Sequence, residues 1–179
     1  MKRFLWLFLF LFSACASAGQ PGSSGKAHED FTVKIPEQWM RLNVPDSFMC
    51  SKDGPFEQYI YIQQRHVSDP LPHAKKSLAP GMKPAELAEV LIREISADPG
   101  VLDLQVIETG AAKVNHHDGF KMIFTYKIKD GYSFKTLYYG FLAGDWFYGI
   151  RYNADVNKYS DGDVRVFEEM MKSFVPKGA

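Results

Sequence analysis

Three consecutive residues, His116, His117 and Asp118, carry side chains that commonly bind transition metals. Imidazole nitrogen and carboxylate oxygen are both zinc ligands, and a zinc site gathers several of them at about 2.0–2.3 Å from the metal. Consecutive residues of a strand point to opposite faces, so His116 and His117 could share a metal only where a turn bends the chain. His66 and His73 lie in one long Pro-rich segment and provide a second pair. One hypothesis is therefore a periplasmic enzyme or metal-handling protein that uses His116, His117 and the His66–His73 loop.

The sequence contains no spacing pattern that is specific for catalysis or metal binding. It lacks HExxH and CxxC, which place two metal ligands together, and GxSxG, which presents a nucleophilic serine. It also lacks the glycine-rich loops that bind phosphates. We therefore expect the histidines to be solvated turn and loop residues, with no catalytic residue, no metal and no cofactor. A non-catalytic binding domain is the favoured function, and an enzyme is the alternative.

The first eighteen residues have the features of a bacterial secretion signal. Two basic residues precede the apolar run Phe4–Phe12, and small residues follow it. The run holds about nine residues, whereas a helix needs about twenty to span a bilayer. Cleavage before Cys15 would follow a pattern that resembles the lipobox of bacterial lipoproteins, with Phe12 where leucine is preferred. Cleavage before Gly19 would follow the small-x-small rule of ordinary signal peptidase.

These two cleavage sites lead to different locations. After the first, Cys15 would carry the fatty acyl chains, palmitate among them, that anchor a lipoprotein in the membrane. After the second, the protein would be soluble in the periplasm or secreted. We favour the lipid anchor, which makes the membrane the predicted partner and the cell envelope, facing the periplasm or the exterior, the predicted location. Residues 19–30 are rich in Gly and Ser and predict a flexible tether to a single domain over residues 31–176.

Charge and cysteine content restrict the function further. The chain has 21 basic and 21 acidic residues and a formal net charge of zero, so it lacks the excess of positive charge that nucleic-acid binding requires. Cys15 is either lipidated or removed, which leaves Cys50 without a partner for a disulfide within the domain. Because no Lys or His motif beside Cys50 would lower its pKa, we expect a buried, unreactive thiol.

The apolar pattern predicts an α+β fold. Alternating apolar and polar residues predict strands over residues 31–35, 48–52, 57–65, 102–109, 113–115, 120–129, 132–142 and 146–154. Asp130–Gly131 predicts a two-residue hairpin turn. One amphipathic helix should begin at Pro84 and end near Asp98, and a second should begin near Asp161 behind the capping residue Ser160. The C-terminal half is therefore predicted to be an antiparallel meander, packed by these two main α-helices.

The meander is rich in aromatic residues, and two interpretations are open. About half of these side chains should face a core, because strands alternate between faces. The others could form an exposed surface for an envelope protein or an apolar ligand, with Tyr139, Phe141 and Phe147 as candidates. Alternatively, helices could cover both faces of the sheet and bury them all, which is the interpretation we favour.

Several features together resemble the PsbP-like superfamily. An opening strand runs into Ile35-Pro36-Glu37-Gln38-Trp39, a mid-chain amphipathic helix follows, Val114–Gly119 leads into a long strand, and Ser173–Phe174 closes the domain. The superfamily includes the DcrB-type bacterial envelope lipoproteins, and is related to PsbP and to a Ran-binding import factor. The resemblance implies an antiparallel sheet packed by helices, and a non-catalytic binding or assembly role in the cell envelope. It assigns no role to any single residue.

Overall fold

The computed structural model describes residues 30–44, 47–54 and 57–177. The predicted secretion signal, Cys15, both predicted cleavage sites and residues 19–29 of the predicted tether lie outside this part of the chain. Among the described residues, no helix combines the length and the apolar character that crossing a membrane requires.

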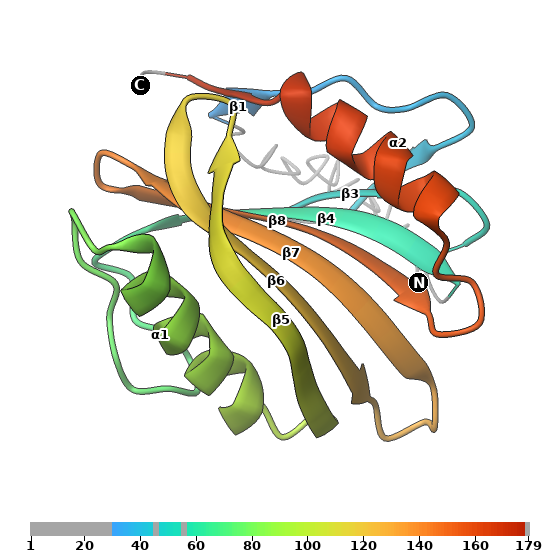
Figure 1. The fold of residues 1–179 in the computed structure, drawn as a ribbon, viewed down its shortest axis with the longest axis horizontal. Helices are drawn as coiled ribbons and strands as arrows, with labels where there is room; N and C mark the ends of the chain where they lie inside the picture. Colours follow the sequence, from blue (N-terminus) through green and yellow to red (C-terminus); the bar gives the residue numbers. More distant parts are fainter. Residues whose placement is uncertain (1–29, 45–46, 55–56, 178–179) are drawn as a thin grey trace, which may run out of the picture.

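A seven-stranded antiparallel sheet forms the centre of the domain (Figure 1). Its order is β2-β3-β4-β8-β7-β6-β5, with bounds β2 Met40–Leu42, β3 Phe48–Ser51, β4 Gln58–His66, β5 Leu102–Val114, β6 His117–Lys127, β7 Ser133–Ala143 and β8 Trp146–Asp155. The C-terminal strands β5 to β8 form the predicted meander, and β8 pairs with β4 from the N-terminal half. A separate two-stranded sheet joins β1 (Phe31–Thr32) to β9 (Val175–Pro176), the first and last strands of the domain.

Two helices cover opposite faces of the sheet (Figure 1). Helix α1 (Pro84–Ala97) begins with proline, whose missing N–H costs nothing in the first turn, and the Lys83 N–H donates to Glu86 Oε2 at 3.1 Å. Helix α2 (Asp161–Lys172) begins behind Ser160, whose Oγ accepts the Asp163 N–H at 3.1 Å. Both helices begin where the sequence predicts, and the α+β class is confirmed.

The sheet has a core on each face because each helix buries one set of alternating side chains. On the α2 face, Phe167 and Met170 pack against a cluster that includes Ile60 and Tyr152. On the α1 face, the apolar side of the helix and part of the 67–83 loop pack against Phe120 and neighbouring residues of β6. Burial on both faces therefore accounts for most aromatic residues of the meander, whereas Tyr132 and Trp146 at its turns stay exposed.

The candidate aromatic surface of Tyr139, Phe141 and Phe147 is corrected by this arrangement. Their exposed fractions are 7%, 0% and 1%, so they form no exposed platform. Tyr139 and Phe141 belong to the α2 core, and Phe147 belongs to the α1 core. Alternation along the strands places these side chains on both faces of the sheet, and the helices that precede and follow the meander, α1 and α2, cover both faces.

Several strand boundaries also differ from the prediction. Residues 102–115 do not form two strands: β5 is one strand that pairs with β6 through Gly110 and Ala111, with register irregularities earlier at Leu102/Gln105 and Val106/Glu108. The Gly-Ala-Ala stretch lacks the β-branched side chains that mark a strand, so pairing rather than local propensity holds it extended. β1 ends at Thr32 rather than at residue 35.

Cys50 is fully buried on β3 and has no disulfide partner among the described residues. Burial raises the pKa of its thiol to about 12, so the thiolate that would attack an electrophile is almost absent at neutral pH. The predicted role of Cys50 as a small apolar core residue is confirmed.

Candidate functional site: a groove between α1 and the sheet

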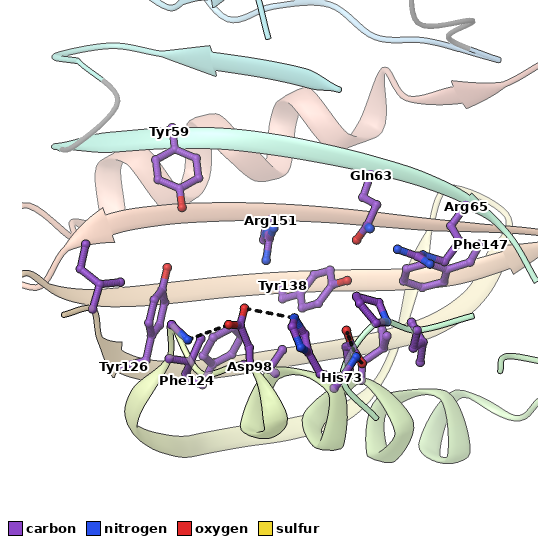
Figure 2. Close-up of a pocket in the computed structure, with 18 residues that line it drawn as sticks. Tyr59, Gln63, Arg65, His73, Asp98, Phe124, Tyr126, Tyr138, Phe147 and Arg151 are labelled. Carbon is purple, nitrogen blue, oxygen red and sulfur yellow. Dashed lines mark hydrogen bonds and ion pairs between the residues drawn. The ribbon is translucent and has the colours of Figure 1, made fainter. Parts of the chain in front are cut away.

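A groove of about 440 Å³ lies between the C-terminal half of α1 and the sheet (Figure 2). One wall comes from β4, with Tyr59 and Gln63 pointing inward, and the opposite wall comes from α1 and the residues after it, including Asp98. Tyr138 of β7 and Arg151 of β8 form the floor between them. The volume is typical of sites that hold a small organic molecule.

Strand register brings the floor residues together. Arg151 is paired directly with Tyr138 on one side and with Tyr61 of β4 on the other. Directly paired residues of antiparallel strands point to the same face, so all three side chains project toward α1. The Tyr138 phenol lies across β8, and a Cβ on Gly149 would be only 2.6 Å from its Oη. Glycine at position 149 therefore leaves the space in which the Tyr138 ring lies.

Arg151 places a positive charge in the groove beside aromatic rings. Its Cζ lies 4.6 Å from the Tyr61 ring centroid and 6.0 Å from the Tyr138 ring centroid. The side chain is half-buried, and the guanidinium keeps its charge at any physiological pH. Within the described residues, no carboxylate forms an ion pair with it and no acceptor forms a hydrogen bond with it.

The tyrosines around Arg151 remain hydrogen-bond donors. Burial raises the pKa of Tyr138 to about 12 and raises the pKa of Tyr126 above its ordinary range. Both hydroxyls are therefore protonated at neutral pH, which leaves the Tyr138 hydroxyl able to donate to an acceptor. Tyr126 is further positioned by Asn153, whose Oδ1 accepts from Thr136 Oγ1 at 2.6 Å and from Tyr126 Oη at 3.4 Å.

The two carboxylates that line the groove, Glu94 and Asp98, already have partners within the protein. Glu94 Oε2 accepts the backbone N–H groups of His73 at 3.0 Å and Ala74 at 2.7 Å, which fixes the preceding loop against α1. Asp98 Oδ1 accepts the Gly100 N–H at 2.8 Å, and its Oδ2 lies 3.8 Å from His73 Nε2. The two carboxylates thus have partners on their own wall.

A second hollow, of about 600 Å³, lies beside α2 and is lined by three exposed cations, Lys34, Arg165 and Lys172, and by the carboxylates of Glu168 and Glu169. There Glu169 pairs with Lys172, and Glu168 accepts the Tyr139 hydroxyl at 2.9 Å. The cations of this hollow are exposed to solvent, whereas Arg151 is half-buried against two aromatic rings, so the α1 groove is the stronger candidate site.

The predicted metal ligands do not converge in the structure. His117 stacks on Phe141, with ring centroids 4.7 Å apart, and its pKa is lowered by burial and by the neighbouring charge of His116. Asp118 pairs with Lys113 at 3.3 Å, and both side chains are exposed. In the described ranges, no three His, Cys, Asp or Glu side chains are grouped so as to hold a metal ion.

The two histidines predicted in the long loop occupy different surroundings. His66 is the last residue of β4 rather than a loop residue; its Nδ1 lies 2.6 Å from Ser68 Oγ, and its ring contacts Trp146 edge-on. His73 instead lines the α1 groove. The loop therefore contributes one of the two histidines to the candidate site, beside Leu71 and Pro72, and Glu94 holds it there by accepting its backbone N–H.

Sequence reasoning did not identify Arg151, although one signal for it exists. On β8, Phe147, Gly149 and Arg151 alternate with Tyr148, Ile150 and Tyr152. Once both sets are known to face a core, a lone arginine among aromatic residues indicates a charge that is held inside the domain. The same reasoning would not have found Tyr61, which meets Arg151 only through the β4–β8 pairing.

Comparisons with known proteins support the fold and leave the function open. No protein-family model matches the chain, and no curated protein does so. Among solved structures, cyanobacterial PsbP from Synechocystis matches with a TM-score of 0.59 and 11% identity, over 89% of this chain and 98% of that one. The Ran-binding protein Mog1p from Saccharomyces cerevisiae matches with a TM-score of 0.56 and 12% identity, over 82% and 90%. The chain has the PsbP-like fold.

This result confirms the predicted superfamily fold and shows nothing beyond the fold, because the identities are so low. A Bacteroides thetaiotaomicron structure also matches, with a TM-score of 0.51 and 10% identity over 83% of this chain, and this chain spans only 45% of that protein. The resemblance to DcrB-type lipoproteins stays a prediction. Sequence identity at this level carries no residue from PsbP or Mog1p onto the groove.

Proposed function

We propose that this chain is a lipid-anchored protein of the bacterial cell envelope whose folded domain binds a ligand in the α1 groove without catalysing a reaction. The observation that carries this proposal is the groove itself, which combines a ligand-sized volume with the uncompensated charge of Arg151. Pockets that join apolar walls to a few placed polar groups are the usual form of a binding site.

Two further points support binding rather than catalysis. The groove offers donors and a fixed positive charge, and among its described lining residues there is no nucleophile with an adjacent base of the kind that covalent catalysis needs. The Saccharomyces protein that shares the fold is a Ran-binding protein, which is a precedent for use of this fold in binding. The anchor rests on the lipobox-like sequence that ends at Cys15 and on the tether after it.

Blocking the groove should abolish ligand retention. Gln63 points into the groove from β4, so Gln63→Trp should fill it, while Gln105→Trp places the same side chain on the exposed edge strand β5. Each variant would be exposed to a small-molecule extract of the producing bacterium's envelope, separated from unbound material by gel filtration, and analysed by mass spectrometry. We expect a compound retained by the wild type and by Gln105→Trp, and lost in Gln63→Trp. Equal retention by all three, or by none, would contradict the proposal.

The anchor should be detectable through Cys15. In cells supplied with a labelled fatty acid, the wild-type chain should incorporate the label and stay with the membrane fraction, because two or more acyl chains hold a protein stably in a bilayer. The Cys15→Ala chain should carry no label and appear in the soluble fraction. The matched control is Cys50→Ala, which removes the other cysteine and should leave labelling unchanged. An unlabelled wild-type chain would instead favour cleavage before Gly19.

A further inference from the structure

The charge of Arg151 indicates what kind of group the groove receives. A charged side chain that is partly removed from water is unfavourable unless an opposite charge or acceptors compensate it. In the part of the chain that the structure describes, Arg151 has neither an opposite charge nor an acceptor as a partner, and it lies against the ring faces of Tyr61 and Tyr138. Such cation–π contacts hold the guanidinium in place but leave its N–H donors available.

The compensating anion is not supplied by the groove's own acids. Glu94 accepts two backbone N–H groups, and Asp98 accepts one and faces His73. The other arginine, Arg65, already donates from Nη1 to the Pro70 carbonyl at 2.8 Å. Arg151 is therefore the one cation lining the groove, among the residues that the structure describes, whose donors have no protein acceptor.

The number and position of charges favour a ligand with a single negative charge. Two carboxylates on the α1 side stand opposite the arginines of the sheet, so a dianion such as a phosphate monoester would be attracted by one wall and repelled by the other. A carboxylate carries one charge, and its two oxygens match the planar fork of a guanidinium. The Tyr138 hydroxyl lies in the same lining and can also donate to a bound carboxylate.

Part of the remaining lining is apolar and flat. The half-buried side chains of Tyr59 and Tyr126 contribute aromatic rings, and Ile95 and Ile128 contribute aliphatic surface. Aromatic side chains favour stacked or edge-on contact with other rings. A ligand that places a carboxylate on Arg151 would therefore bring a planar apolar body against these side chains.

We propose that the α1 groove binds a small organic monocarboxylate with a planar apolar body, with its carboxylate held by Arg151. This inference rests on the proposed function, since it specifies the class of ligand for the same groove. It does not depend on the lipid anchor.

Four naphthalene probes of the same shape and different charge would test the ligand class. Isothermal titration calorimetry would compare 2-naphthoate, 2-naphthylmethanol, 2-naphthylmethylammonium and 2-naphthyl phosphate on the chain carrying Cys15→Ala, which cannot be lipidated. A charge-assisted hydrogen bond should make 2-naphthoate bind about tenfold or more tightly than the neutral alcohol. The ammonium probe should bind most weakly, and the phosphate more weakly than the carboxylate.

Variants of Arg151 would assign the preference to this residue. Arg151→Met should lose the advantage of 2-naphthoate over 2-naphthylmethanol while still binding the alcohol. Arg151→Lys keeps the positive charge without the planar guanidinium, so it should retain part of the affinity advantage of 2-naphthoate. Arg165→Met is the matched control, since Arg165 lies exposed on α2 across the sheet. If Arg151→Met fails to fold, the wild-type probe series still tests whether the groove prefers a carboxylate, and Arg151→Lys still tests whether Arg151 provides that preference.

The outcomes separate the ligand class from the proposed function. Equal affinities for 2-naphthoate and the alcohol would overturn the monocarboxylate class, as would tighter binding of the phosphate or no binding of any probe. None of these results would alter the extract experiment with Gln63→Trp, which tests binding in the groove without assuming a ligand. Loss of the preference in Arg165→Met would also contradict the assignment to Arg151.

Discussion

Replacing Gly119 with alanine should destabilise the domain by about 3 kcal/mol or more, at the upper end of what overpacking costs. A Cβ at this position would lie 2.3 Å from the Gly140 carbonyl oxygen and 2.9 Å from the Phe141 Cβ. The oxygen belongs to the backbone of β7, which is paired with both β6 and β8. It can move only if hydrogen bonds in the middle of the sheet are broken, so little relaxation is available.

Urea unfolding followed by circular dichroism would measure this loss. The midpoint should fall without a change of slope, because the surface exposed on unfolding stays the same. Gly110→Ala is the matched control: Gly110 lies on the edge strand β5, and its added Cβ would meet nothing within 4 Å. The free energy of unfolding of Gly110→Ala should stay within about 0.5 kcal/mol of the wild-type value. Equal stabilities of the two variants would show that β6 and β7 do not approach at Gly119 as described.

Local features of the sequence account for most of the elements. Alternation predicts β6, β7 and β8, but the turn between β6 and β7 is longer than the predicted two residues. Residues 128–132 lie between the strands, the Gly131 N–H donates to the Ile128 carbonyl at 2.9 Å, and Gly131 adopts a φ of 88°, which a side chain would disfavour. Pro84 and Ser160 mark the starts of the helices. Each of these signals acts over a few residues, which is why the sequence alone exposes them.

The short strands and the candidate site depend on pairings between distant residues. β2 and β9 have two or three residues each and acquire their strand geometry from partners elsewhere in the chain. The groove depends on the pairing of β4 with β8, which places Tyr61 beside Arg151. Nothing in either strand specifies the other as its neighbour, because both carry alternating apolar residues that suit any central strand. The sequence of β8 therefore shows a lone arginine among aromatic residues. It does not show which aromatic rings of other strands surround that arginine.

Truncating Phe174 to alanine should cost about 3–5 kcal/mol, the usual range for a fully buried phenylalanine. Phe174 has an exposed fraction of 0% and follows α2 directly. Its ring centroid lies 5.1 Å from that of Phe31, 5.5 Å from that of Tyr148 and 5.9 Å from that of Phe141. It thus joins the small β1–β9 sheet to the main sheet, and its loss would leave a cavity bordered by three rings.

The matched control and the binding probe make this prediction specific. Val175 is the next residue and is 54% exposed, so Val175→Ala should change stability by no more than about 0.5 kcal/mol. Phe174 packs in the α2 core, whereas the groove lies on the α1 face. Below its lowered unfolding temperature, Phe174→Ala should therefore bind 2-naphthoate as tightly as the wild type. A small stability loss would contradict the packing of the aromatic cluster, and a weakened affinity in a folded variant would show that the two faces of the sheet are coupled.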